Sequence, residues 1–551
     1  MFTINTNASD YCSPLNLSTL SWNKSKDCCS WDGVHCEKTT GQVIELDLYC
    51  SGLQGKFHSN SSLFQLSNLG WIDLSYNDFS GSLISPKFGE LSNLMDLDLL
   101  RLGFTGVIPA EISHLSKLQG LSISSDDPYG LRLGSYSYEL LLKNLTQLRE
   151  LDLDFVNISS TNPLNFSSYL TTLRLSHTQL RGVFPERVFH LSNLQYLYSS
   201  SNSLTGPIPS NWQNSPVQVQ NIVLRYSKKK SVARSYSKVT PRPAGPTNSY
   251  SLSQNNFSGQ ISSAICNLKA LMLLDLGRNH LNGTIPHCLA EMSMVSILDL
   301  SNNYLSGTIN TTFNAENLLL IINLYGNKLK GKVPASLINC RYLEFLDLGN
   351  NELNDTFPSW LGGLPGLKIL SLRSNKFHGP ISDSRTNNSF AQIRVIDLTS
   401  NGFIGNLPVS LFENFQAMKI IGDKSRTREY VADYYPGNYA NTLIVTTKGL
   451  DLELPRVLNT EVITNLSRNR FEGYLPSIIG DLVGLRTLNL SHNGLEGIIP
   501  ASLHQLSVLE SLDLSSNKIG GEIPQQLASL TFLAVLNLSH NHLVGCIPRG
   551  K

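Results

Sequence analysis

The stretch from Leu485 to Leu509, LRTLNLSHNGLEGIIPASLHQLSVL, decides the fold because the chain repeats it with little change. LESLDLSSNKIGGEIPQQLASLTFL follows, and then LAVLNLSHNHLVGCIP. The shared pattern is LxxLxLxxNxLxGxIPxxLxxL. Its asparagine recurs every 24 residues, at Asn469, Asn493, Asn517 and Asn541, and upstream at Asn255, Asn279, Asn303, Asn327, Asn351 and Asn375. A fixed period of this length is typical of a stacked repeat array.

Each repeat provides one short strand, LxxLxL, whose leucines point into the coil. Strands from successive repeats stack in parallel about 4.8 Å apart. The asparagine amide both donates and accepts hydrogen bonds, so it can satisfy the backbones of neighbouring coils. Removing one such buried amide is expected to cost about 1–3 kcal/mol. No single repeat buries its apolar face, so stability comes from the stack.

These features predict an α/β leucine-rich repeat solenoid, a right-handed superhelix with a parallel sheet on its concave face and short 3-10 or irregular segments on its convex side. About eighteen repeats are expected from Val43 to Pro548. Leu102, Val156 and Thr178 stand where asparagine is expected. The predicted parts are an N-terminal cysteine cap (1–42), leucine-rich repeats (43–217), a basic irregular insert (218–250), further repeats (251–417), an island that leaves the coil (418–460) and four terminal repeats (461–551).

The charge balance argues against a nucleic-acid partner. The 43 Lys and Arg residues face 42 Asp and Glu residues, so no global basic field exists. No apolar run reaches the roughly 18–20 residues that span a membrane. The segment FTINTNASDYC after Met1 lacks the apolar core of a signal peptide. We therefore expect the natural start to lie upstream of Met1.

Asn-x-Ser/Thr sequons nevertheless favour the secretory pathway. Three of them, at Asn465, Asn489 and Asn537, belong to the strand of the repeat itself, where glycan attachment is disfavoured. The sites predicted to carry glycans are Asn7, Asn16, Asn23, Asn60, Asn144, Asn157, Asn165, Asn256, Asn282, Asn310, Asn354 and Asn387.

Four of the nine cysteines lie within the first 36 residues, as in an oxidised end cap. We expect the bridges Cys12–Cys28 and Cys29–Cys36, with Trp22 or Trp31 covering the first coil. The other cysteines are Cys50, Cys266, Cys288, Cys340 and Cys546. Cys266 and Cys288 lie in adjacent repeats and can form a bridge. Cys340 takes a leucine position and is expected to be a core thiol, and no partner is assigned to Cys50 or Cys546.

The basic insert contains LRYSKKKSVARSYSKVTPRPAGPTN, with seven basic residues and no acidic ones. It can be interpreted as a nuclear-localisation or polyanion-binding patch, or as a solvated loop. The second interpretation is favoured, because nuclear import contradicts the sequons and the cap cysteines.

Catalytic chemistry finds little support. Asp275 and Asp299 would lie about 5 Å apart on neighbouring strands, as in a retaining glycosidase, but aspartate recurs along the whole sheet. His540 and His542 flank the inward-pointing Asn541, so they are interpreted as independent surface residues rather than metal ligands. We predict no enzyme activity, no metal and no cofactor.

What remains is a binding surface. The third, fifth, seventh and eighth positions of LxxLxLxxN face the concave side, where the consensus places Asp, Ser and Asn. Aromatic residues and arginine dominate interface energies, so departures toward them favour recognition. They include Trp71, Tyr76 and Arg101, and the predicted ligand-binding set is Phe155, Arg174, His177, Tyr196, Tyr198, Arg278, Tyr325, Phe345 and Arg373.

Several runs resemble plant leucine-rich receptor-like proteins, most of all the tomato leaf-mould resistance receptors: HSNSSLFQLSNL, FSSYLTTLRLSHTQLRG, NDTFPSWLG, LKILSLRSNK and SLTFLAVLNLSHNHLVGCIP. The resemblance covers all but the basic stretch after Gln218. It implies the extracellular part of a cell-surface immune receptor without a kinase domain, at the plasma membrane, which recognises secreted pathogen effectors. It also implies two kinase partners, a constitutive adaptor and a shared co-receptor. The family's signal peptide, acidic stretch, membrane helix and basic tail have no counterpart here.

The resemblance identifies the tyrosine-rich segment EYVADYYPGNYANTLIVTTKG (429–449) as part of the family's island. Tyrosines bury area at little entropic cost. The predicted co-receptor contacts are Tyr434, Tyr435, Tyr439 and Lys448 in the island, with Thr487, His492, Ser511, Ser515 and His540 in the last repeats. Two alternatives stay open: a secreted inhibitor of pathogen cell-wall-degrading enzymes, which normally has fewer repeats and no island, and a non-functional truncated receptor copy.

Overall fold

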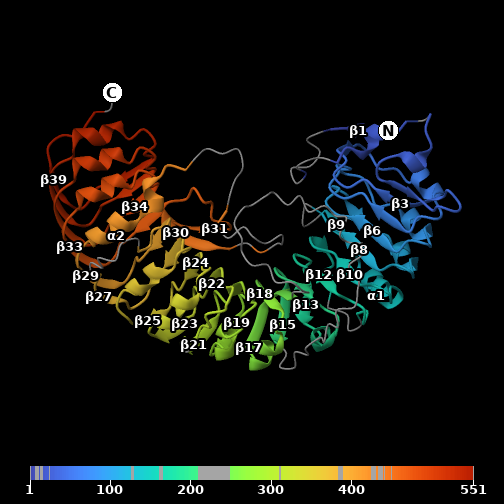
Figure 1. Ribbon diagram of the computed structural model, residues 1–551, viewed down its shortest axis with the longest axis horizontal. Coiled ribbons are helices and arrows are strands. Elements are labelled where there is room, and N and C mark those ends of the chain that lie inside the picture. The colour runs from blue at the N-terminus through green and yellow to red at the C-terminus, as the bar shows by residue number, and fades with distance from the viewer. Residues whose placement is uncertain are drawn as a thin grey trace. The chain divides into compact units, whose positions relative to one another are not determined.

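The computed structural model describes residues 2–5, 12, 16–23, 25–125, 130–160, 166–208, 248–309, 312–381, 389–422, 430–431, 439, 441–447 and 450–549. The chain forms two compact units, Met1–Ser258 with Asn267–Leu271 and Gly259–Cys266 with Met272–Lys551. In each unit every coil contributes one strand to a parallel sheet, here called the main sheet (Figure 1). Most of the predicted basic insert lies outside the described residues.

In the first unit the parallel strands of the main sheet are β3 (Val43–Asp47), β5 (Trp71–Asp73), β6 (Asp96–Leu99), β8 (Gly120–Ile123), β10 (Glu150–Asp152), β12 (Thr172–Arg174), β14 (Tyr196–Tyr198) and β16 (Asn248–Ser251). In the second unit they are β18 (Leu271–Asp275), β20 (Ile297–Asp299), β22 (Ile321–Asn323), β24 (Phe345–Asp347), β26 (Ile369–Ser371), β28 (Val395–Asp397), β32 (Ile463–Asn465), β34 (Thr487–Asn489), β36 (Ser511–Asp513) and β38 (Val535–Asn537). Neighbouring strands pair in register, position by position, as Leu488 with Leu512.

A second set of short strands follows the asparagine of each coil. In the first unit it comprises β7 (Gly106–Val107), β9 (Leu131–Arg132), β11 (Val156–Asn157), β13 (Arg181–Val183), β15 (Ser203–Pro207) and β17 (Asn256–Gln260). In the second unit it comprises β19 (His280–Gly283), β21 (Tyr304–Thr308), β23 (Lys328–Gly331), β25 (Glu352–Leu353), β27 (His378–Pro380), β29 (Gly402–Asn406), β33 (Arg470–Tyr474), β35 (Gly494–Ile498), β37 (Lys518–Glu522) and β39 (His542–Val544). We call these strands the side sheets.

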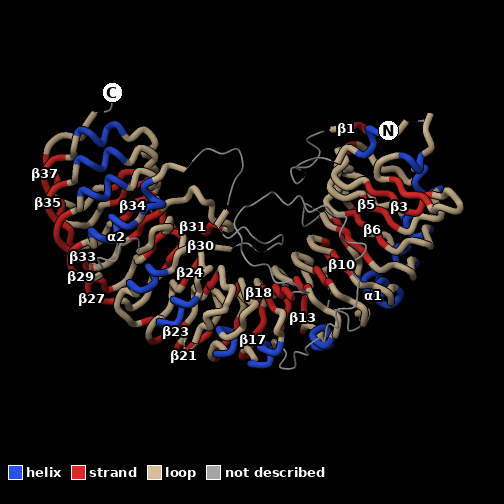
Figure 2. Tube along the Cα trace, in the orientation of Figure 1, coloured by secondary structure: helices blue, strands red, loops and turns tan. Residues whose placement is uncertain are grey.

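Short helical turns complete the coils, and Figure 2 shows them in blue, apart from the red strands. Two are α-helical, α1 (Ser135–Asn144) and α2 (Val409–Asn414). The 3-10 turns of the repeats are Ser62–Gln65, Pro86–Glu90, Ala110–His114, Glu186–His190, Ser263–Asn267, His287–Ala290, Ala335–Asn339, Ser359–Gly363, Gln416–Lys419, Ser477–Asp481, Ala501–Gln505 and Gln525–Ser529. Many begin directly after the proline of the IP step, because proline fixes φ and lacks a donor that this end would leave unpaired.

The core and the asparagine ladder form as the repeat predicts. Leu485, Leu488 and Leu490 of one coil are at most 1% exposed. Asn303 donates its amide to the carbonyl of Leu276 in the preceding coil at 3.0 Å, and its side-chain oxygen accepts from Leu281 N at 3.0 Å. One side chain therefore bonds two backbone groups of the preceding coil, one on each side of the turn between its two strands.

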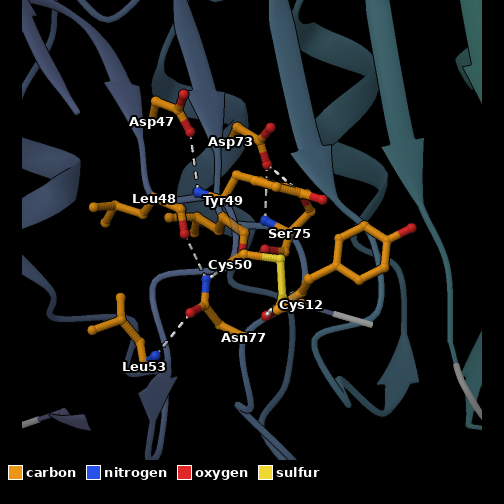
Figure 3. Close-up of a disulfide and its surroundings, with 11 residues drawn as sticks. Cys12, Asp47, Leu48, Tyr49, Cys50, Leu53, Asp73, Ser75 and Asn77 are labelled. Atoms are coloured by element: carbon orange, nitrogen blue, oxygen red, sulfur yellow. Dashed lines mark hydrogen bonds between the residues drawn. A yellow bond between two sulfur atoms is a disulfide. The ribbon is translucent and has the colours of Figure 1, made fainter. Parts of the chain in front are cut away.

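The same ladder operates at the N-terminal end of the first unit. Figure 3 shows Asn77 donating to Leu48 O and accepting from Leu53 N, both at 2.8 Å. Where the ladder residue changes, the bonds change with it. The hydroxyl of Thr178 lies within hydrogen-bond distance of the Leu175 carbonyl of its own coil, at 2.8 Å, and of Asn202 Oδ1 in the next coil, at 3.0 Å.

Directly before the ladder residue the backbone turns left-handed in coil after coil. Tyr76 has φ 60°, Arg278 has φ 54° and His492 has φ 53°. This conformation is unfavourable for side chains larger than glycine or asparagine. It persists at these positions because the ladder bonds on either side fix the turn.

The N-terminal cap differs from the expected disulfide pattern. Cys29 pairs with Cys36 as predicted, but Cys12 pairs with Cys50, and Cys28 is a free thiol, so the predicted Cys12–Cys28 bridge is wrong. The backbone explains the change. The N–H of Asn16 donates to Cys50 O at 2.9 Å, which places this part of the N-terminal segment beside the end of the first repeat strand.

The rest of the cap is small. It contains β1 (Thr3–Ile4), which pairs with β4 (Leu53–Gln54), and β2 (Val34–Cys36), which runs antiparallel to β3. Two short turns, Ser18–Ser21 and Cys28–Ser30, precede β2. Trp22 and Trp31 stack on each other with ring centroids 5.1 Å apart.

The remaining cysteines behave as the sequence allows. Cys266 and Cys288 form a bridge between adjacent coils, with their Cα atoms 6.0 Å apart. Cys340 is a fully buried free thiol, and burial raises its pKa to about 12. Cys546 is exposed and free.

The ladder makes a direct prediction about stability. Asn517→Ala removes a donor to Leu490 O and an acceptor for Leu495 N, both at 3.0 Å, and should lower the free energy of unfolding by about 1–3 kcal/mol. Asn493→Ala should behave alike, whereas Lys518→Ala, one residue away and exposed, should change little. Chemical denaturation measures all three. Equal midpoints would contradict the ladder.

Candidate recognition surfaces

The side chains at the third, fifth and seventh positions of each coil lie on the face of the main sheet that points away from the coil interior, here called the open face. The third position differs between the two units. In register along the first unit it reads Glu45, Trp71, Asp96, Gly120, Glu150, Thr172, Tyr196 and Ser249. In the second unit it reads Leu273, Ile297, Ile321, Phe345, Ile369, Val395 and Ile463, and then Thr487 and Ser511.

The island explains this apolar row. Its described residues include the antiparallel hairpin of β30 (Leu443–Thr447) and β31 (Leu450–Leu454), drawn beside β24 in Figure 1. Val431, Leu443, Val445 and Val457 of the island pack on the seven apolar third-position residues from β18 to β32, with Tyr439 and Leu454 at the margin. We call this cluster the island core. Each apolar side chain buried there contributes about 1.5–3 kcal/mol.

Polar contacts orient the island on its core. Arg373 donates two hydrogen bonds to Asp451, at 3.1 and 3.0 Å, and one to Ile444 O at 3.1 Å. Arg278 forms an ion pair with Glu453, which lies on β31 like Asp451. The hydroxyl of Tyr439 donates to Asp299 Oδ2 at 3.0 Å. Charged pairs near the surface are worth little on their own, so they set the position of the hairpin while burial holds it.

Three carboxyl groups of the main sheet near the island, Asp299, Asp347 and Asp397, are buried. Burial raises the pKa of Asp347 to about 7 and that of Asp397 to about 6, although the Arg373 guanidinium opposes the shift at Asp397. Burial also raises the pKa of Asp299. The open face under the island is therefore a low-dielectric environment in which aspartate is costly to ionise.

Four of the predicted ligand-binding residues thus belong to the island interface. Phe345 is fully buried in the island core, so its prediction as an exposed contact is corrected. Arg373 is 6% exposed, and Arg278 holds Glu453. Tyr325 is half-buried near Arg373, whose charge opposes the rise of its pKa caused by burial.

The other five residues come together on three neighbouring strands of the first unit. We call Phe155, Arg174, His177, Tyr196 and Tyr198 the aromatic–arginine cluster. The Arg174 guanidinium lies 4.7 Å from the centre of the Tyr198 ring, and its Nε lies 3.8 Å from Asp152 Oδ2. The Phe155 and His177 rings stack with centroids 4.5 Å apart. The cluster presents flat, rigid side chains of the kind that dominate interface energies.

The charge of the cluster is set by its neighbours. Burial and then the charge of Asp152 raise the pKa of Asp154 to about 8, even though Ser176 N donates to that carboxyl at 2.7 Å. Burial lowers the pKa of His177. Burial therefore favours the uncharged forms of both the His177 imidazole and the Asp154 carboxyl group.

The predicted co-receptor residues fall into three groups. Tyr434, Tyr435 and Lys448 lie outside the described residues. Tyr439 packs against the island core, so it anchors the island instead of reaching outward. In the last repeats His492 and His540 are exposed, whereas the small side chains at Thr487, Ser511 and Ser515 are buried between taller neighbours.

The predicted glycosylation sites also differ in exposure. Exposed side chains occur at Asn16, Asn23, Asn60, Asn256, Asn282 and Asn354, and half-buried ones at Asn144 and Asn157. Asn465 and Asn489 are buried in the main sheet, as expected for the strand motif. Asn7, Asn165, Asn310 and Asn387 lie outside the described residues. Glycosylation itself remains a prediction at all of these sites.

A signal for the docked island was present in the sequence but was not used. Seven consecutive third positions, from Leu273 to Ile463, carry apolar residues on a face that is normally polar. Such a run predicts that another segment covers these strands, because a sheet with one face in water alternates apolar with polar residues.

No helix among the described residues is long and apolar enough to cross a membrane.

The buried carboxyl groups predict that the island docks more tightly in acid. A carboxyl whose pKa is raised on docking favours the docked state below its ordinary pKa, and this gain disappears as pH rises through the raised values near 6 and 7. Amide hydrogen exchange in Leu443–Val445, corrected for intrinsic rates, should show greater protection at about pH 5 than at about pH 8.

A matched variant tests the cause. Asp347→Asn with Asp397→Asn keeps the shape of the protonated acids and should flatten this pH dependence while the fold is retained. Equal protection of the hairpin at both pH values in the unmodified protein would contradict the prediction.

Comparison with known proteins agrees with the repeat. The leucine-rich repeat family profiles match residues 465–519 and 484–543, and also 193–215, 294–315 and 342–364. The ectodomain of the Arabidopsis receptor kinase GASSHO1/SCHENGEN3, solved with CASPARIAN STRIP INTEGRITY FACTOR 2, superimposes with a TM-score of 0.65 at 25% identity, over 97% of this chain and 60% of that one. The Arabidopsis receptor kinase HAESA, solved with the peptide hormone IDA and the co-receptor SERK1, gives 0.62 at 27% identity, over 97% and 84%.

Curated relatives are much more similar in sequence. The chain is 50% identical to Receptor-like protein Cf-9 homolog of Solanum lycopersicum, over 89% of this chain and 78% of the relative. It is also 50% identical to Receptor-like protein Cf-9 of Solanum pimpinellifolium, over 89% and 76%. The alignments run over 660 and 658 positions, so these relatives carry residues that the 551-residue chain lacks. The chain belongs to the plant leucine-rich repeat receptor-like proteins, in the family of Receptor-like protein Cf-9.

Proposed function

We propose that this chain is the extracellular part of a plasma-membrane immune receptor, which recognises secreted pathogen effectors and signals through partner receptor kinases. The observation that carries the proposal is the aromatic–arginine cluster in a chain of this family. The cluster places two tyrosines, a phenylalanine, a histidine and an arginine on adjacent strands of a main sheet that is otherwise rich in aspartate and serine.

The island restricts where an effector can bind. It covers the open face from β18 to β32, so Arg278 and Arg373 are occupied by Glu453 and Asp451. The aromatic–arginine cluster belongs to the first unit, and none of its residues is part of the island core. We therefore assign effector contact to the cluster and not to the second unit.

Kinase partners are proposed for the island and the last repeats. HAESA was solved together with a peptide hormone and a co-receptor, which supports such a complex for a related ectodomain. On strand β31 of the hairpin Leu450 is 65% exposed and Leu452 is 41% exposed. His492 and His540 are exposed on the last repeats. These side chains form the proposed co-receptor surface. We also propose an adaptor kinase as a partner, and this part of the proposal rests only on the resemblance of the sequence to the receptor-like protein family.

The effector proposal predicts a specific loss of binding. Arg174→Ala, Tyr196→Ser and His177→Ser in one variant should weaken capture of a secreted fungal effector at least about tenfold, because interface hot spots commonly cost 2 kcal/mol or more each, with about 1.4 kcal/mol per factor of ten. Tyr198 stays, since it is only 5% exposed and supports the fold.

The measurement is capture of secreted fungal proteins on the immobilised chain. The matched control is the triple variant Tyr304→Ser, Lys328→Ala and His280→Ser, which removes the same classes of side chain from a side sheet. Undiminished capture by a folded cluster variant would place recognition elsewhere.

The co-receptor proposal predicts a different loss. Leu450→Ser with Leu452→Ser and His492→Ala should reduce effector-dependent co-precipitation of a co-receptor kinase from leaf tissue, in a membrane-anchored full-length form. The island core is untouched, so surface abundance should hold. Ile498→Ser, 67% exposed on β35, is the control. Unchanged co-precipitation with the hairpin variant would show that the island is only a cover.

A further inference from the structure

A side sheet places one of the predicted glycosylation sites directly beside an exposed aromatic ring. Asn282 on β19 and Tyr304 on β21 are register partners on neighbouring parallel strands. Both side chains point to solvent, and the next residue on each strand, Leu281 before the first and Leu305 after the second, is fully buried. Tyr304 is 51% exposed. A group attached to the Asn282 side chain therefore has the tyrosine ring as its neighbour.

Other side chains hold the Tyr304 ring in place. The His280 ring, on β19, meets it edge-on with the two centroids 5.8 Å apart. Lys328 lies on β23, on the other side of β21, and its Nζ is 5.2 Å from the centre of the tyrosine ring. Contacts from both neighbouring strands thus fix the ring beside Asn282, whose own side chain is exposed.

We propose that an N-glycan on Asn282 packs its first N-acetylglucosamine against the Tyr304 ring and so stabilises this part of the side sheet. Asn282, Gly283 and Thr284 form a sequon, the acceptor signal for such a glycan. Attachment forms a bond between the asparagine amide nitrogen and C1 of the sugar. The bond from C1 to the pyrophosphate of a lipid-linked oligosaccharide donor breaks, the pyrophosphate leaves with the electron pair, and the amide proton passes to a base.

The arrangement suits a sugar. Neighbouring strands lie about 4.8 Å apart. The amide nitrogen of Asn282 stands at the height where the ring of Tyr304 begins, so the first sugar lies alongside the ring. The faces of a pyranose ring carry C–H bonds, which are apolar partners for the face of an aromatic side chain. Covering an exposed ring is favourable in proportion to the apolar area that is removed from water.

Other sequons on the side-sheet strands have different register partners. Asn256 on β17 pairs with Thr205, and Asn157 on β11 pairs with Arg132. Neither partner has an aromatic ring, so the proposal singles out Asn282 among these three sites. It does not depend on effector or kinase binding, and it requires only that the chain pass through the secretory pathway.

The test uses the full chain, secreted from a eukaryotic host behind a cleavable leader and trimmed enzymatically to one N-acetylglucosamine at each occupied sequon. Glycopeptide mass spectrometry measures the occupancy of Asn282. Amide hydrogen exchange, corrected for intrinsic rates, measures the local protection of β21. Asn282→Gln removes the glycan, Tyr304→Ser removes the ring, and the double variant completes a cycle that isolates the contact between them. Tyr304→Phe keeps the ring, and Asn256→Gln, measured on β15, is the matched control.

Asn282 should be occupied, and β21 should exchange at least about threefold more slowly with the glycan than in Asn282→Gln, an effect of the size expected for one aromatic contact. Tyr304→Phe should keep this slowing and Tyr304→Ser should lose it. The exchange of β15 should be the same with and without the glycan on Asn256. An unoccupied Asn282, equal exchange of β21 with and without its glycan, or the same slowing in Tyr304→Ser would overturn the proposal. These outcomes leave effector capture and co-receptor recruitment, which test the receptor function, unaffected.

Discussion

The asparagine amide that joins each coil to the one before it is the contact on which the structure depends. In Asn327, as in its counterparts, the amide donates to the carbonyl of the previous coil, and its oxygen accepts from a backbone N–H that no strand pairs. Without it, every coil would bury two unsatisfied backbone groups. Because the ladder and the inward leucines use fixed positions, the third, fifth and seventh positions are free to vary. Binding surfaces are built from this freedom.

The sequence was sufficient for the coil and insufficient for what covers it. The spacing of Asn255 to Asn375 determines strand, ladder and turn, since each of these forms from contacts within one or two repeats. The docked island depends on contacts such as Tyr439 with Asp299, which are 140 residues apart, and no period encodes them. The bridge from Cys12 to Cys50 was missed for a related reason, because Cys50 stands inside the first repeat and did not look like part of the cap. Of the predicted ligand-binding residues, those of the first unit lie on neighbouring coils and their binding role stays a prediction, whereas Phe345 and Arg373 contact the island, which no repeat period encodes.

The two units use the same scaffold in opposite ways. In the second, apolar side chains on the open face hold an internal cover, and burial supplies most of the energy while Arg373 and Arg278 fix its position. In the first, the open face keeps its acids and adds aromatic residues, with Arg174 held between Asp152 and the Tyr198 ring. In the second unit the apolar residues of the open face are buried under the island and stabilise the fold. In the first unit the aromatic residues of the open face are available for binding.

The fit between the island and the seven strands beneath it limits how such genes can exchange parts. Repeats with polar open faces are interchangeable, since a crossover between two of them joins one ladder to another of the same period. A crossover between β18 and β32 would separate apolar third positions from the segment that covers them, and leave a row of residues such as Ile369 and Val395 in water. An exchange of repeats that keeps these side chains covered would therefore carry β18 to β32 and the island together, or break outside them.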